Sequence, residues 1–146
     1  MQRLTNQELA LNLLTLSFKN SVSVPVDSKK YSAFGVITSF FLNDLSKRSK
    51  IPYKSGIDTT SNLSSKIFRE IAWCLGVDYS LFEAKEKLID QKLLSCRNHI
   101  AHGEYLKIDI SEFNELREEV LNLMILFKNQ IENIAVQKLY LKVEHL

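Results

Sequence analysis

The sequence predicts an all-α protein, a helical bundle of about five helices that forms one domain over residues 1–146. Three observations lead to this fold class. The chain contains only 4 Gly and 2 Pro in 146 residues, and apolar residues recur at spacings of three and four positions along most of it. Its 45% hydrophobic and 25% charged residues are typical of a globular chain that is long enough to bury a core.

The first helix is predicted to open at Thr5, because Thr5 and Glu8 have the spacing of a capping box. Leucines then follow at helical spacing, at Leu9, Leu13 and Leu16. The next residues, 17–30, read SFKNSVSVPVDSKK and are too polar for a core. Within them the run SVSVPV favours a short extended segment, since Val24 precedes a proline.

The second helix is predicted over about residues 30–47, with its apolar face made of Phe34, Ile37, Phe41 and Leu45. The third is predicted over about residues 61–75, with buried positions at Leu63, Ile67, Ile71 and Cys74. Gly76 follows directly and is expected to end this helix in the left-handed conformation.

The fourth helix is predicted to begin near Leu81 and to carry a continuous apolar stripe of Phe82, Ile89, Leu93, Cys96 and Ile100. The fifth is predicted to open near Asp109, with Glu112 three residues later, and to place Phe113, Leu116, Val120, Leu123, Phe127 and Ile134 at heptad-like intervals. Because VLNLMILF puts apolar residues on every face, we expect the middle of this helix to be buried nearly all round. Such a helix suits both a central core position and a subunit interface.

Charge is unevenly distributed although the net charge is only +2. Residues 1–75 carry 10 basic and 5 acidic side chains, whereas residues 76–146 carry 9 basic and 12 acidic ones. Most of the basic excess lies in SKRSKIPYKSG, at Lys47, Arg48, Lys50 and Lys54. This loop could follow a phosphate backbone, and the alternative is a solvated loop whose lysines favour solubility.

No apolar run approaches the roughly 18 residues of a membrane-spanning helix, and Gln7 and Glu8 interrupt the only early apolar stretch. The two cysteines, Cys74 and Cys96, are too few for a disulfide framework. We therefore expect a cytoplasmic protein without a membrane partner.

The stretch CRNHIAHGEY, residues 96–105, gathers two of the three histidines beside Arg97 and Asn98. On a helix Asn98 and His102 share one face, and Gly103 is expected to end the helix there. An arginine can hold a phosphate and a histidine can transfer protons near neutral pH. Together they suit cleavage of RNA through its own 2′-hydroxyl, without a metal or another cofactor.

Two other interpretations of this cluster stay open. Cys96, His99 and His102 lie three residues apart and could bind zinc, although a closed site needs a fourth ligand. Alternatively, Arg97 pairs with an acidic neighbour and both histidines are ordinary surface groups.

The run RNHIAH resembles the motif of the HEPN superfamily, an arginine and a histidine separated by four to six residues, commonly with Asn or Asp after the arginine. The longer run KLLSCRNHIAHGEYLKIDISEFNEL is similar to the stand-alone bacterial branch associated with toxin and antitoxin modules, and the resemblance covers about residues 60–140. It implies a helical homodimer in which two motifs form one metal-independent ribonuclease site. By this resemblance Arg97 binds the scissile phosphate, Asn98 orients the backbone or the histidine, and His102 transfers protons. His99 occupies a variable position and is at most a substrate-binding residue.

The resemblance also implies partners. RNA would be the substrate of a toxin or antiphage effector, and an antitoxin would hold it in check. In one HEPN toxin group a nucleotidyltransferase antitoxin modifies a tyrosine just after the motif; Tyr105 lies near that place, one residue further on. The chain is further expected to lack the first long helix usual in the family. The alternative function is a catalytically silent HEPN-type module that binds nucleic acid or a protein.

Overall fold

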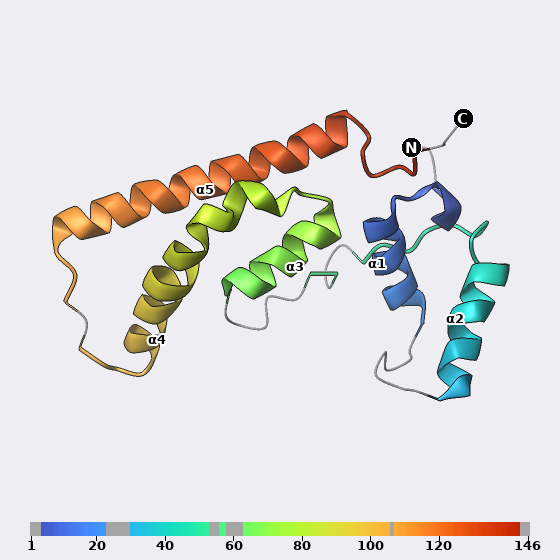
Figure 1. Cartoon of the computed structure of the whole chain (residues 1–146), viewed down its shortest axis with the longest axis horizontal. Helices are drawn as coiled ribbons and strands as arrows, with labels where there is room; N and C mark the ends of the chain where they lie inside the picture. The colour runs from blue at the N-terminus through green and yellow to red at the C-terminus, as the bar shows by residue number, and fades with distance from the viewer. Residues whose placement is uncertain (1–3, 23–29, 53–55, 58–62, 106, 144–146) are drawn as a thin grey trace. The chain divides into compact units, whose positions relative to one another are not determined.

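The computed structural model describes residues 4–22, 30–52, 56–57, 63–105 and 107–143, and regular structure in these ranges is helical. Apart from two isolated β-bridges, no strand occurs in them, so the predicted all-α class is confirmed. The elements in chain order (Figure 1) are η1 (Asn6–Glu8), α1 (Leu11–Ser21), α2 (Tyr31–Asn43), α3 (Ser65–Leu75), η2 (Tyr79–Lys85), η3 (Leu88–Leu94), α4 (Ser95–Ala101) and α5 (Ile110–Val136).

The chain divides into two compact units. Unit 1 comprises Met1–Asp58, Cys74–Gly76 and Ala135–Leu146, and unit 2 comprises Thr59–Trp73 and Val77–Ile134. Each unit is described by itself below. The expectation of one domain over residues 1–146 stays a prediction.

The N-terminus of unit 1 contains the predicted capping box, but it does not start a long helix. Thr5 donates from its backbone N and its Oγ1 to the Glu8 carboxylate at 2.7 and 2.6 Å. These hydrogen bonds lower the pKa of Glu8. Only the single 3₁₀ turn η1 follows, because the backbone N of Ala10 bonds to Tyr140 O at 2.9 Å instead of continuing a helix. α1 therefore begins at Leu11.

A buried polar pair organises the interior of unit 1. Ser17 is fully buried and donates to Asn6 Oδ1 at 2.7 Å, while Asn6 donates to the backbone O of Asp44 at 2.8 Å. The backbone N of Lys50 in turn donates to Ser17 Oγ at 3.0 Å. The prediction that residue 17 already belongs to a polar linker was therefore wrong, since its hydroxyl is satisfied inside the core. The expected extended SVSVPV run lies mostly outside the described residues.

The apolar face predicted for the second helix was also wrong. α2 buries Ala33 and Phe40, whereas Phe34 is 57% exposed and Phe41 is 47% exposed. Phe40 packs edge-on against Phe18 of α1, with 5.0 Å between ring centroids. Phe41 also lies against Phe18, with 6.2 Å between ring centroids, but this contact covers only part of its side chain.

Four aromatic rings meet in the interior of unit 2. Phe68 of α3 lies 5.7, 5.1 and 5.2 Å from the ring centroids of Tyr79, Phe82 and Phe127. Burial raises the pKa of Tyr79 to about 12, and its hydroxyl donates to Ser65 O at 3.2 Å. α3 thus buries Phe68 and Ala72, one position away from the predicted face, while Leu63 is 45% exposed. The helix ends as predicted at Gly76, which has φ +75°.

The predicted fourth helix is three helical segments of different pitch. η2 is a 3₁₀ helix, η3 is a π-helix and only α4 is an α-helix. Phe82 and Ile89 are buried as predicted, but Ile100 is 67% exposed. Because 3₁₀ and π segments advance by different angles per residue, a stripe extrapolated at 3.6 residues per turn does not stay on one face.

α5 begins at Ile110, directly after the predicted opening at Asp109, and Asp109 Oδ1 accepts from the backbone N of Glu112 at 2.8 Å. The expectation that its middle is buried nearly all round was wrong, because no residue of α5 is buried. Met124 and Ile125, for example, are 61% and 55% exposed. Among the described helices, none has the length and hydropathy to cross a membrane.

Candidate active site

The motif CRNHIAHGEY lies on α4 and on the turn that ends it, within unit 2. The preceding π-helix is anchored in the core by Leu88 and Ile89, and its Asp90 accepts from the backbone N and the hydroxyl of Ser65 at 2.7 and 2.5 Å. α4 itself buries no residue. One end of this helical run is thus fixed in the core, while the polar motif at the other end is accessible.

The end of α4 has the hydrogen bonds of a Schellman motif. Glu104 N donates to His99 O at 2.9 Å and Gly103 N donates to Ile100 O at 3.2 Å, which are the bonds that define this cap. Gly103 has φ +68°, a conformation that glycine adopts without the cost that a Cβ imposes. Gly103 therefore ends the helix as predicted and turns the chain back over its last turn.

Arg97 and Asn98 are held together at the surface of α4. Arg97 is exposed, and its Nη1 donates to Asn98 Oδ1 at 3.1 Å. The interpretation in which Arg97 pairs with an acidic neighbour has no support in the described residues, where its recorded partner is the neutral Asn98. The guanidinium therefore keeps donors for an anion, and Asn98 orients it.

His99 has contacts at both ring nitrogens. Nδ1 lies 2.8 Å from the backbone O of Ser95, and Nε2 lies 3.4 Å from Oε2 of Glu104. A backbone oxygen can only accept, so Nδ1 must be the donor in the first contact. Both ring nitrogens of His99 thus already have partners within the protein.

His102 is the C-cap residue of α4, with φ −90° and ψ 3°, and its side chain is exposed. Its backbone N donates to Asn98 O at 2.9 Å. Within the described part of the chain no hydrogen bond or ion pair involves its imidazole, in contrast to His99. The ring is therefore accessible for proton transfer. Tyr105, the candidate modification site, is 89% exposed.

The zinc alternative can be compared with this geometry. Among the described residues, no group of three or more His, Cys, Asp or Glu side chains is arranged to hold a metal ion. In particular, Cys96, His99 and His102 do not form such a group. Residues three apart lie near one another on a helix, but the His99 ring is directed toward Ser95 and Glu104.

The basic loop belongs to unit 1, whereas the motif belongs to unit 2. Backbone bonds hold this loop: Asn6 N donates to Lys47 O and Ser49 N to Leu4 O, both at 3.0 Å. The side chains of Lys47, Arg48 and Lys50 are exposed, and Lys47 pairs with Asp44 at 2.5 Å. Lys54 lies outside the described residues.

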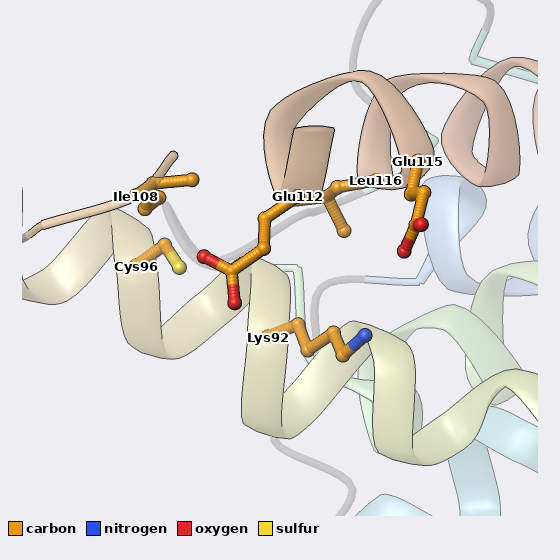
Figure 2. Close-up of a pocket in the computed structure, with 6 residues that line it drawn as sticks. All are labelled: Lys92, Cys96, Ile108, Glu112, Glu115 and Leu116. Atoms are coloured by element: carbon orange, nitrogen blue, oxygen red, sulfur yellow. The ribbon is translucent and has the colours of Figure 1, made fainter. Parts of the chain in front are cut away.

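A cavity that sequence reasoning missed opens beside the motif helix. It has a volume of about 240 Å³. Figure 2 shows Lys92 and Cys96 projecting from the helical run toward Glu112, Glu115 and Leu116 of α5, with Ile108 at one side. The sequence shows that Lys92 and Cys96 share one helix face and that Glu112, Glu115 and Leu116 share another, because they are three or four residues apart. It does not show that these two faces lie opposite each other, because that is set by tertiary packing.

Comparisons with known proteins place the chain in a family. A family model described as RiboL-PSP-HEPN matches residues 1–133, which extends the resemblance seen over about residues 60–140 to the N-terminal part of the sequence. No curated protein and no solved structure matches the chain. Members of the HEPN superfamily are often ribonucleases that bind RNA and dimerise, so the family match indicates a function that is related to RNA in general. With 133 of 146 residues matched by that model, and with the Arg97 to His102 motif on an exposed helix end, the chain belongs to the RiboL-PSP-HEPN family of the HEPN superfamily.

Proposed function

We propose that this protein is a metal-independent RNA endonuclease whose active site forms where two copies of the motif meet in a homodimer. The observation that carries the proposal is that the polar side chains of α4 differ in their contacts. Arg97 is exposed and oriented by Asn98, and His102 is exposed at the helix end, whereas His99 is occupied by Ser95 and Glu104.

In the proposed reaction the 2′-hydroxyl of a ribose attacks the adjacent phosphorus. His102 transfers a proton, either from the attacking hydroxyl or to the departing 5′-oxygen. Arg97 stabilises the charge that develops on the non-bridging oxygens. The P–O5′ bond breaks, and the products are a 2′,3′-cyclic phosphate and a free 5′-hydroxyl. A second motif copy would supply the complementary acid or base, since each chain contributes one such histidine.

Exposed apolar side chains support a dimer. Ile100 of α4 is 67% exposed, and Ile110 and Phe113 of α5 are 75% and 53% exposed. Large apolar side chains that stay exposed on the motif helix and on the start of α5 favour contact with another protein surface. A second copy is the partner that also completes the proposed site.

The reaction is tested with purified protein and a single-stranded RNA in EDTA. We expect cleavage to persist in the chelator and to leave a cyclic phosphate, and a 2′-deoxyribose at the cleaved position should prevent it. A requirement for divalent metal, or equal cleavage of DNA, would contradict the mechanism. RNA binding without cleavage would instead favour the silent binding module.

The composite site is tested by light scattering at micromolar concentration, where we expect a dimer. Mixing wild-type chains with an excess of Arg97→Ala chains and allowing subunit exchange should reduce activity below the fraction of wild-type chains present. A strictly proportional loss, or a monomer that cleaves RNA, would exclude a site shared by two chains.

The biological role that we propose is that of a toxin or antiphage effector, restrained in the cytoplasm by an antitoxin or a nucleotidyltransferase. Tyr105 is accessible to such a modifying enzyme because it is 89% exposed. Lys47, Arg48 and Lys50 are proposed to bind RNA phosphates, and the same role is proposed for Lys54 from the sequence. Expression of the wild-type chain should arrest growth, whereas expression of His102→Ala should not.

A further inference from the structure

The turn that carries His102 is closed by two contacts between the same two residues, His99 and Glu104. Glu104 N donates to His99 O at 2.9 Å, and the Glu104 carboxylate lies 3.4 Å from His99 Nε2. The first contact belongs to the helix cap, but the second depends on the side chains that this sequence has at positions 99 and 104.

The His99 ring is fixed on its other side as well. Its Nδ1 donates to Ser95 O at 2.8 Å, one turn earlier on α4. Because Nδ1 carries the proton donated to Ser95 O, Nε2 can donate to the Glu104 carboxylate only in the charged form of the ring, in which both bonds exist at the same time. Ser95, His99 and Glu104 therefore form a chain of contacts from the body of α4 to the residue beyond its cap.

We infer that Glu104, acting through His99, is a positioning residue for His102, an inference that rests on the proposed ribonuclease function. His102 lies between the two contacting residues and has the cap conformation, with φ −90° and ψ 3°. The direction of its imidazole therefore depends on how firmly the cap is closed. We call the His99 and Glu104 side-chain contact the latch.

The need for a latch follows from the position of His102 at a helix end. Helix ends fray, because their last carbonyl groups lack partners within the helix. Gly103 allows the turn but adds no side-chain contact, and a Cβ placed on Gly103 would meet no atom within 4 Å. A displacement of about 1 Å in a reacting group can cost up to a hundredfold in rate. A side-chain contact across the turn reduces that displacement.

The latch is a weak source of stability, which separates a positioning role from a structural one. The side chains of His99 and Glu104 are 43% and 60% exposed, and exposed ion pairs contribute little to folding. Removal of the latch should therefore change catalysis more than it changes the melting temperature. The latch also supports the assignment of proton transfer to His102 and not to His99, since both ring nitrogens of His99 already have protein partners.

The first experiment compares Glu104→Ala with Glu104→Gln. Glu104→Ala should lower kcat by about tenfold and change KM by less than about twofold, with an unchanged melting temperature. Glu104→Gln keeps an oxygen acceptor at the same reach and should restore most of kcat. Glu70→Ala, an exposed carboxylate of the same unit on α3, is the matched control and should behave as wild type.

A double-mutant cycle tests whether Glu104 acts through the two histidines. His99→Ala combined with Glu104→Ala should lose no more activity than either change alone. In a His102→Ala background, Glu104→Ala should cause no further loss. A further loss there would show that Glu104 acts independently of His102, which would overturn the inference.

Amide hydrogen exchange measures the latch without reference to activity. The amides of residues 103 and 104 donate the two cap bonds, so their exchange should be about tenfold faster in Glu104→Ala than in wild type. Unchanged exchange would overturn the inference.

Failure of the inference and failure of the proposed function give different patterns. If Glu104→Ala cleaves RNA as wild type does while His102→Ala is inactive, the latch is not a positioning device and the proposed function stands. If His102→Ala retains wild-type activity, or wild type does not cleave, the proposed function fails and this inference fails with it.

Discussion

The π-helix before the motif and the α-helix that carries it are consecutive and equally long, yet they have opposite environments. η3 (Leu88–Leu94) and α4 (Ser95–Ala101) each have 7 residues. η3 buries Leu88 and Ile89, whereas α4 buries none. The difference separates two tasks within one helical run: the first half attaches the run to the core of unit 2, and the second half presents polar side chains.

The π geometry of η3 is consistent with this separation. π segments inside helices are rare and occur frequently at functional sites. Here the segment ends directly before the motif, at Leu94. It changes which residues face the core, so that the apolar stripe through Ile89 leaves Ile100 67% exposed.

The largest expected effect is on activity and belongs to α4. Arg97→Ala and His102→Ala should each lower kcat/KM for RNA cleavage by about a hundredfold or more, the scale for loss of a general acid or base or of a charge-stabilising group. Neither change should lower the melting temperature, because both side chains are exposed. His99→Ala should cost about tenfold through the latch. Wild-type cleavage by His102→Ala together with inactive His99→Ala would mean that the two histidines have been assigned the wrong roles.

The second effect is on stability and belongs to η3. Ile89 is 1% exposed, and Ile89→Ala should reduce the free energy of unfolding by about 2–5 kcal/mol, because the deletion leaves a cavity in the core. Ile100→Ala is the matched change in α4 and should cost less than about 0.5 kcal/mol in a dilute monomer. Urea unfolding at low protein concentration measures both. Equal losses would contradict the division between the anchored and the accessible half.

The smallest effect concerns the start of α5, on the other side of the motif turn. Asp109 accepts from the backbone N of Glu112 at 2.8 Å and from the hydroxyl of Ser111 at 2.6 Å. The Ser111 hydroxyl and then the Glu112 amide lower the pKa of Asp109 from its ordinary value of 3.8. Asp109→Ala should therefore lower the melting temperature by a few degrees at neutral pH, with no loss of kcat.

The pH dependence of that change has a definite sign. A carboxyl group whose pKa is lowered in the folded protein stabilises it above the unfolded pKa and loses this effect as the pH falls through the folded value. The melting difference between wild type and Asp109→Ala should thus be constant near neutral pH and shrink below about pH 4, where Asp109 of the unfolded chain becomes protonated while the folded protein still holds it as a carboxylate. A difference that grows on acidification would show that the cap does not depend on the carboxylate.

Sequence reasoning worked best where a structure depends on neighbours along the chain. The Asp109 start of α5, the Gly76 and Gly103 helix ends and the Thr5 and Glu8 capping box were all predicted, because each is a hydrogen-bonding or backbone requirement within about five residues. The Arg97 to His102 motif could be found in the sequence for the same reason. Arg97, Asn98 and His102 lie within one and a half turns, and the family match over residues 1–133 confirms the superfamily that they indicated.

Burial was predicted less well, because it depends on partners distant in sequence. The sequence predicts that Ser17 belongs to a linker, but in the structure its buried hydroxyl bonds to Asn6 and to the backbone N of Lys50. α5 reads as a buried helix, yet the described part of the chain covers no residue of it completely.

The sequence by itself determined the helical class, the helix ends and the residues of the motif, since propensity and capping are local properties of the chain. Only the tertiary structure decided which motif side chains are occupied. His99 and His102 are the same residue type, and the cap bonds from Glu104 and Gly103 and the carbonyl of Ser95 distinguish them. The tertiary structure also decided that the apolar stripe does not continue from Ile89 to Ile100, because the 3₁₀ and π segments before α4 advance by a different angle per residue.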